Sequence, residues 1–169
     1  TKNLGGSLEM IQLKAAPIDG LSIQGSAART DNQTGDQTAN EEGVSANLGA
    51  KYTMGPVSVG YTEGGNQTAV ASGEITYYEN KFYGFQYDVN DALSLSYNVD
   101  ESDKNVRSAV AVAATAGTKV VTGMEQKSYQ VAYTTGGATI GIAQVEVSNS
   151  DYTVGKTEEQ TVISLGISF

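Results

Sequence analysis

Hydrophobic and polar residues alternate along most of the chain with a period of two, the pattern of a β-strand with one apolar and one polar face. The stretch 44–54 shows this clearly, because its even positions are apolar or aromatic and its odd positions are small or polar. The same alternation recurs at 20–30, 57–62, 81–89, 92–99, 128–134 and 161–169, and more weakly at 8–16 and 138–147. The pattern predicts about nine strands and no amphipathic helix of useful length.

The connections between these strands alternate in length. Short connections near 17–20, 55–56, 90–91 and 136–137 have the composition of tight turns. Long polar connections lie near 31–43, 63–79, 100–126 and 148–159. This order predicts an antiparallel up-and-down meander with tight turns at one end and large loops at the other. The Ala/Val-rich middle of 100–126 leaves three readings open: an extended hairpin, a short helix in a loop, or an additional pair of strands.

A period of two does not say what the apolar face contacts. A soluble barrel buries that face in its core, whereas an outer-membrane barrel turns it toward lipid. Lipid is favoured by the segregated loop lengths, by strands of about 9–11 residues and by polar faces with few charges. Aromatic residues also lie on the apolar face near the short-turn end, as a membrane girdle requires; they are Tyr52, Tyr87, Tyr133 and Phe169.

Composition narrows the chemistry further. The 169 residues include no cysteine and no histidine, which removes disulfides, thiolate metal sites and the commonest general base. The net charge of -9 argues against nucleic acid as a partner. The carboxylate pairs 41–42, 100–101 and 158–159 read as solvated loop acids, and the acids of 31–42 lack a calcium-loop spacing. We therefore expect neither an enzyme nor a bound cofactor or metal.

Several stretches of the chain resemble a known family of proteins. The stretch Thr161–Phe169 looks like the closing strand of bacterial outer-membrane proteins, and Tyr52–Tyr61 with Tyr133–Gly141 resembles general-diffusion porins of the alphaproteobacterial type. The resemblance implies a Gram-negative outer-membrane location, a homotrimer and contact with lipopolysaccharide. It also implies that the barrel-assembly machinery recognises the last strand through Ile163, Leu165, Ile167 and Phe169.

The resemblance also bears on the architecture. Porins of this family are sixteen-stranded barrels of about twice this length, so residues 1–169 are expected to be the C-terminal part of one transmembrane β-barrel domain. The alternative is a complete eight-stranded barrel. Its interior must be filled by side chains, and the small residues of the polar faces would leave voids there.

The expected function is a water-filled pore for passive diffusion of small hydrophilic solutes and ions, with a weak preference for cations from its acidic rims. The predicted pore-lining residues are Lys14, Gln24, Asn47, Lys51, Gln86, Asp88, Asn98 and Gln130. Three cations with the parity of the apolar face, Arg29, Lys81 and Lys127, are expected to contact glycolipid, or else to pair with loop acids such as Glu79 or Glu125. A structural or adhesive barrel and a soluble ligand-binding barrel remain the alternative functions.

Overall fold

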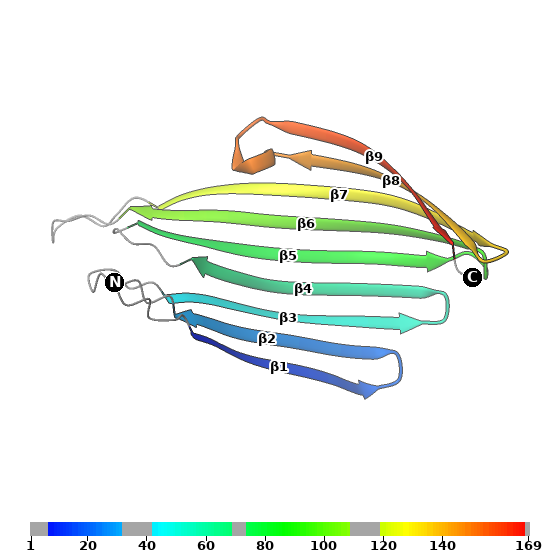
Figure 1. The fold of residues 1–169 in the computed structure, drawn as a ribbon, viewed down its shortest axis with the longest axis horizontal. Coiled ribbons are helices and arrows are strands. Elements are labelled where there is room, and N and C mark those ends of the chain that lie inside the picture. Colours follow the sequence, from blue (N-terminus) through cyan, green and yellow to red (C-terminus); the bar gives the residue numbers. More distant parts are fainter. Residues whose placement is uncertain (1–6, 32–41, 69–73, 109–118, 168–169) are drawn as a thin grey trace.

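The computed structural model describes residues 7–31, 42–68, 74–108 and 119–167. Nine strands pair in chain order as one antiparallel sheet (Figure 1). The strands are β1 (Ser7–Ile18), β2 (Leu21–Asp31), β3 (Glu42–Met54), β4 (Val57–Thr68), β5 (Glu74–Asp88), β6 (Leu93–Ser108), β7 (Lys119–Thr135), β8 (Ala138–Ser148) and β9 (Thr157–Ile167). The 3-10 turn η1 (Ser150–Tyr152) lies between the last two strands. The predicted all-β meander of nine strands is confirmed.

The strands extend farther than the hydrophobic pattern predicts. β4 continues to Thr68 and β5 begins at Glu74, so both strands enter the stretch 63–79 that was predicted to be a loop. The hydrogen-bonded ladder needs no apolar side chains, and Glu63 lies directly opposite Lys81 in it. In the same way β6 and β7 prolong their hairpin into 100–126, as far as Ser108 and Lys119. The Ala/Val-rich middle, for which three readings were left open, lies outside the described residues.

The tight turns follow from local chemistry. Gly20 has a φ of +76°, and a Cβ there would lie 2.2 Å from the carbonyl oxygen of Thr53. Asn90 closes the turn between β5 and β6, because its Oδ1 accepts hydrogen bonds from the N–H groups of Ala92 and Leu93, each 2.9 Å long. Pro17, which has no N–H to donate, lies where the register between β1 and β2 shifts.

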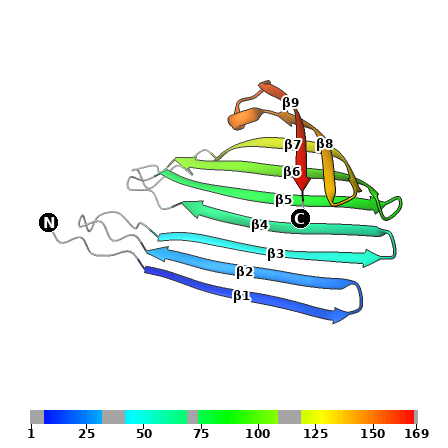
Figure 2. The same ribbon diagram turned by 45° about the vertical axis from the view of Figure 1, so that its right-hand side comes forward.

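The sheet is a single curved layer. Strands β1 to β5 run side by side, while β8 and β9 turn steeply away from them (Figures 1 and 2). One hollow of about 570 Å³ is lined by residues from all of β5 to β9, so the face that carries it is concave. We call that face the concave face and the opposite one the convex face. Among the described residues, Val99 is the one buried apolar side chain.

No helix in the described segments is long or apolar enough to cross a membrane. Most of the large apolar side chains lie instead on the convex face, where the register groups the predicted set Leu48, Tyr61, Phe85, Leu95, Val131 and Leu165. Each of these side chains is exposed, from 40% for Leu95 to 65% for Leu165. The sheet therefore has no dry protein core on its apolar side among the described residues.

Candidate functional site

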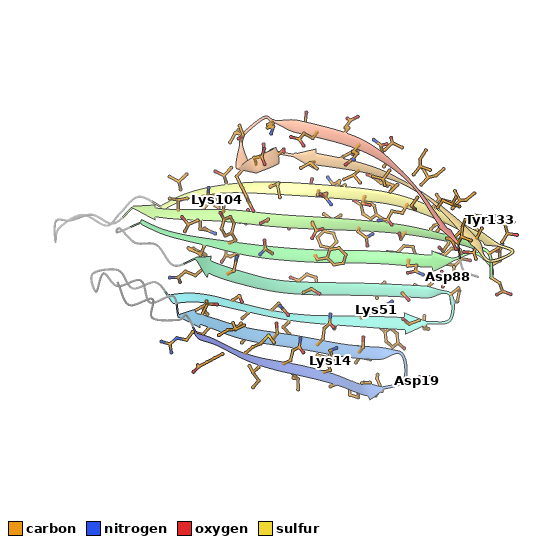
Figure 3. All side chains as sticks on the ribbon, in the orientation of Figure 1. Lys14, Asp19, Lys51, Asp88, Lys104 and Tyr133 are labelled. Carbon is orange, nitrogen blue, oxygen red and sulfur yellow. The ribbon has the colours of Figure 1, made fainter. Side chains whose placement is uncertain are left out.

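The concave face collects all eight predicted pore-lining residues. Lys14 lies opposite Gln24, and the ladder with strand alternation then places Asn47 and Lys51 on the same side. Residues that are paired across successive strands form a row perpendicular to the strands, which we call a hydrogen-bonded row. One such row runs from Lys51 to Asn98 through two glycines, Gly60 and Gly84. The remaining members of the set are Gln86, Asp88 and Gln130. Figure 3 labels Lys14, Lys51 and Asp88 on three of the strands that build this face.

Hydrogen bonds between side chains fix several of these polar residues. Asn47 Nδ2 donates to Ser26 Oγ over 2.9 Å, and Gln86 Nε2 donates to Asp88 Oδ1 over 2.9 Å. Gln130 Nε2 donates to Ser128 Oγ over 2.8 Å. These bonds run within a strand or between neighbouring strands, so they order the wall without closing it. The face therefore presents a preorganised polar surface to whatever lies in front of it.

Small residues hollow this polar surface. A Cβ on Gly60 would meet only the carbonyl oxygen of Ala50, at 3.8 Å, so the space above Gly60 is open. A second hollow of about 330 Å³ lies there, between Lys51 on β3 and Asn98 on β6. Phe82 also lines it and is the large aromatic ring in the middle of an otherwise polar wall. The open sides of these hollows suit water and small polar molecules passing along the surface better than a buried ligand.

The apolar residues of the convex face form a band that crosses the hydrogen-bonded rows obliquely. On the long-loop side, the row of Arg29 runs through Val44, Gln67, Tyr77 and Asn105 to Val121 on β7. The cation that borders the apolar residues of β7 is Lys127, six residues closer to the short turns than Val121. The border of the band is thus displaced along the strands between β2 and β7.

The opposite border is displaced in the same direction. The row of Leu21 runs through Tyr52, Val59, Phe85, Tyr97, Tyr129 and Gln144 to Thr161 on β9. The apolar residues of β9 begin only at Ile163 and extend to Ile167, six residues beyond Thr161. Six residues correspond to about 20 Å along a strand. This displacement occurs over five interstrand steps from β2 to β7 and over seven from β2 to β9, each step about 4.8 Å wide. The band is therefore inclined by about 30–40° to the rows.

Tyrosines mark both borders of the band. On the long-loop side, Tyr61 Oη donates to Glu63 Oε2 and Tyr83 Oη donates to Glu101 Oε1, each over 3.0 Å. On the short-turn side lie Tyr87 and Tyr133, as the sequence predicted. A ring in the apolar band with its hydroxyl on the polar border is the arrangement that tyrosine adopts at a water–lipid boundary. The long-loop row of tyrosines was missed in the sequence because these residues read there as ordinary apolar positions.

The three predicted glycolipid residues lie on the long-loop border. Lys127 Nζ is 2.6 Å from Glu125 Oε1, the kind of pairing with a loop acid that the sequence left as the alternative. Lys81 lies opposite Glu63 on one side and Glu101 on the other. Arg29 lies opposite Val44. Each cation thus directly follows or precedes the apolar segment of its strand, and at least one of them has a carboxylate partner.

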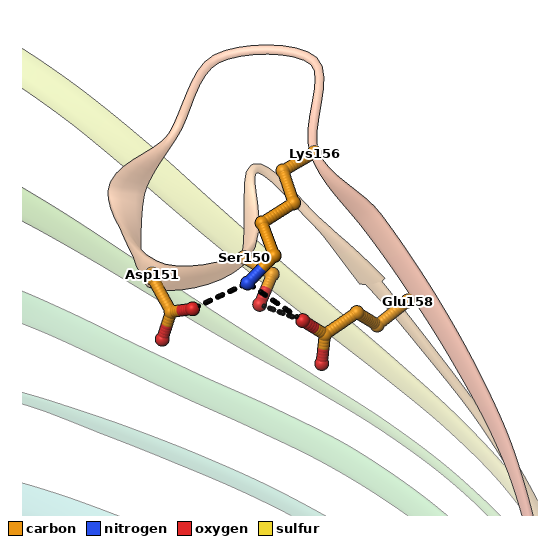
Figure 4. Close-up of polar contacts among 4 residues, drawn as sticks. All are labelled: Ser150, Asp151, Lys156 and Glu158. Atoms are coloured by element: carbon orange, nitrogen blue, oxygen red, sulfur yellow. Dashed lines mark hydrogen bonds and ion pairs between the residues drawn. The ribbon is translucent and has the colours of Figure 1, made fainter.

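The loop between β8 and β9 carries an ion-pair cluster (Figure 4). Lys156 Nζ contacts Asp151 Oδ2 and lies 2.9 Å from Glu158 Oε1, which also accepts a hydrogen bond from Ser150 Oγ over 2.8 Å. These two bonds hold the pKa of Glu158 below the ordinary range of a glutamate. The same carboxylates, Asp151 first, raise the pKa of Lys156. Nothing in the sequence pattern pointed to this cluster, because its members have no periodicity.

In the two carboxylate pairs that the structure describes in full, the neighbouring side chains point apart. Asp100–Glu101 and Glu158–Glu159 lie in strands β6 and β9, not in loops as predicted, so the two members of each pair face opposite sides of the sheet. Over the described ranges, no three acidic side chains lie close enough together to hold a metal ion. The acids of 32–41 and the residue Phe169 lie outside the described residues.

Comparisons with protein-family models, with curated protein sequences and with solved structures find no match for this chain.

The ion-pair cluster should make the loop between β8 and β9 sensitive to acid. Because the pKa of Glu158 is lowered by folding, its stabilising contribution is complete above the ordinary glutamate pKa and is lost as the pH falls through the lowered pKa. We expect the Ser150 amide, which donates to the Lys156 carbonyl over 2.9 Å, to lose hydrogen-exchange protection over that range. Protection factors corrected for the intrinsic pH dependence of exchange measure this.

A variant pair makes this test specific. In Lys156→Gln the pKa of Glu158 should return toward its ordinary value, so protection should be lost at higher pH. Lys14→Gln is the matched control, because it removes the same charge from β1, at the opposite edge of the sheet from β8 and β9. An unchanged midpoint in Lys156→Gln would show that the ion pair does not hold the loop.

Proposed function

We propose that this chain forms part of a transmembrane β-barrel in the outer membrane of a Gram-negative bacterium, and that the barrel is a porin. Its convex face lies against lipid and its concave face lines a water-filled pore. Small hydrophilic solutes and ions pass through the pore down their gradients without any catalytic step. This function needs a polar wall, an apolar exterior and no reactive centre.

The oblique course of the apolar band is the observation that carries this proposal. The strands of a transmembrane barrel are tilted by about 35–45° to the barrel axis. The apolar segment must therefore shift from one strand to the next if it is to stay at the same depth in the bilayer. The inclination of about 30–40° found here between the band and the hydrogen-bonded rows agrees with that requirement. Tyrosines on both borders add the expected aromatic girdles.

Closure of the sheet into a barrel is the second part of the proposal. In the described sheet β1 pairs only with β2 and β9 only with β8, so each outer strand has one unpaired edge. Unpaired backbone groups are very costly in a lipid environment, which makes closure necessary for a membrane protein. We propose that additional strands close the sheet to a sixteen-stranded barrel, because the hollowed polar wall suits a wide pore better than the filled interior of a small one.

Passage of ions tests the function directly. The intact protein, reconstituted in planar bilayers, should give discrete conductance steps, and its reversal potential in a salt gradient should indicate a weak preference for cations. Lys51→Gln removes a cation from the concave face and should move the reversal potential toward stronger cation preference. Lys81→Gln is the matched control, because it removes the same charge from the convex face and should leave the reversal potential unchanged.

Three results would count against this proposal. Absence of conductance would favour the structural or adhesive barrel. Equal effects of the two lysine substitutions would contradict the assignment of the faces. Full solubility of the intact protein without detergent would contradict the membrane location, because the exposed convex face would then be covered by protein.

The border cations give a prediction about lipid. We propose that Arg29, Lys81 and Lys127 contact the anionic groups of lipopolysaccharide at the height of the long-loop border. Changing all three to Gln should lower the amount of glycolipid that co-purifies with the protein. Measurement of bound lipid phosphate in detergent extracts tests this. An unchanged content would leave the pairing with acids such as Glu125 as their role.

The resemblance of the sequence to outer-membrane porins adds assembly and oligomerisation to the proposal. The apolar residues Ile163, Leu165 and Ile167 share the convex face of β9 and, with Phe169, would be read by the barrel-assembly machinery. The intact barrel would associate as a homotrimer.

A further inference from the structure

The loop between β8 and β9 does not extend away from the sheet. It folds back over the concave face at the long-loop end, where the ring of Tyr152 lies 5.6 Å from the ring of Tyr78 on β5. The Tyr152 hydroxyl lies 2.7 Å from Ser102 Oγ on β6, and Lys104 Nζ on β6 lies 5.9 Å from the ring centre. Tyr152 therefore reaches past β7 to contact two strands that are not neighbours of its own hairpin.

The contact surface belongs to the polar wall. Tyr78, Ser102 and Lys104 have the same parity on their strands as the pore-lining residues Gln86 and Asn98. Ser102 Oγ in turn donates to Asn80 Oδ1 over 2.6 Å, so the Tyr152 hydroxyl joins a short hydrogen-bonded chain across β5 and β6. The loop thus docks on groups that would otherwise face the open space in front of the sheet.

The backbone of the loop is held in an uncommon conformation. Asn149, Asp151 and Tyr152 have φ values of 52°, 55° and 56°, in the left-handed region that residues with a Cβ rarely occupy. Such a conformation persists only where surrounding contacts determine it. Those contacts are present: Asn149 Nδ2 donates to the Gly123 carbonyl over 3.0 Å, and Asn149 Oδ1 accepts from the Gly155 amide over 2.9 Å. The ion-pair cluster of Figure 4 closes the base of the loop.

We propose that this docked loop acts as a size filter at the long-loop end of the pore, with Tyr152 as the residue that sets the position of the loop. The inference rests on the porin function proposed above. A segment fixed against the concave wall narrows the cross-section at the long-loop end, where solutes enter. Hydrophilic solutes then pass an edge formed by a phenol ring, the ammonium of Lys104 and the Asp151–Lys156–Glu158 cluster. Release of Tyr152 widens the entrance, and the permeation rate increases most for the larger neutral solutes.

The test compares permeation in three variants of the intact protein. Tyr152→Ala removes both the ring contacts and the hydroxyl, whereas Ser102→Ala keeps the ring contacts and removes the two hydrogen bonds of Ser102, to the Tyr152 hydroxyl and to Asn80. Val154→Ala is the matched control, because Val154 lies in the same loop and is 82% exposed. Proteoliposome swelling with neutral sugars from arabinose to stachyose measures the size cut-off. We expect Tyr152→Ala to raise the rate for stachyose relative to arabinose by about twofold or more, Ser102→Ala to have a smaller effect and Val154→Ala to have none.

Trypsin cleavage after Lys156 reports the docking of the loop without reference to transport. We expect faster cleavage in Tyr152→Ala than in the wild type and in Val154→Ala. Equal cleavage rates would contradict the docked loop, and a freed loop with an unchanged sugar cut-off would contradict the filter while leaving the porin function standing. Absence of sugar uptake by the wild type would contradict the porin function itself.

Discussion

An apolar sheet face must be covered, and in this molecule no described element covers it. Folded domains normally bury such a face against a second layer. Here the sheet is one layer, and large apolar side chains such as Leu48 and Phe85 are 59% and 45% exposed on its convex side. What covers that side determines what the molecule can do. Lipid satisfies the requirement without a second layer, and it also explains why the band of apolar residues runs obliquely to the strands.

The polar face has the complementary property. Its side chains are ordered by hydrogen bonds, such as that between Asn47 and Ser26, yet glycines keep the surface hollowed and open. Its hollows are open on one side, which fits the proposed wall along which solutes move. Where the wall reaches the long-loop end, the docked Tyr152 loop is the part of the described structure that projects over it.

The local features could be predicted from sequence, and the features that depend on contacts between strands could not. Alternation over 44–54 and the turn chemistry of Asn90–Asp91 are encoded within a few residues, so the strands and the meander followed from them. The oblique band needed the register, which alternation alone does not fix. The docking of Tyr152 on Ser102 joins residues 50 positions apart, and the continuation of β4 to Thr68 depends on its neighbouring strands.

The most direct measurement concerns what each face of β6 contacts. Because the chain has no cysteine, single cysteines at 94–98 can each carry one nitroxide label in the reconstituted intact protein. Lipid-soluble oxygen should relax labels at Leu95 and Tyr97, whereas a water-soluble nickel chelate should relax labels at Ser94, Ser96 and Asn98. The account predicts that accessibility to oxygen and accessibility to the nickel chelate both alternate along 94–98, each being high where the other is low. Labels at Leu95 and Tyr97 that are shielded from oxygen, or that are reached by the nickel chelate as readily as those at Ser96, would contradict it.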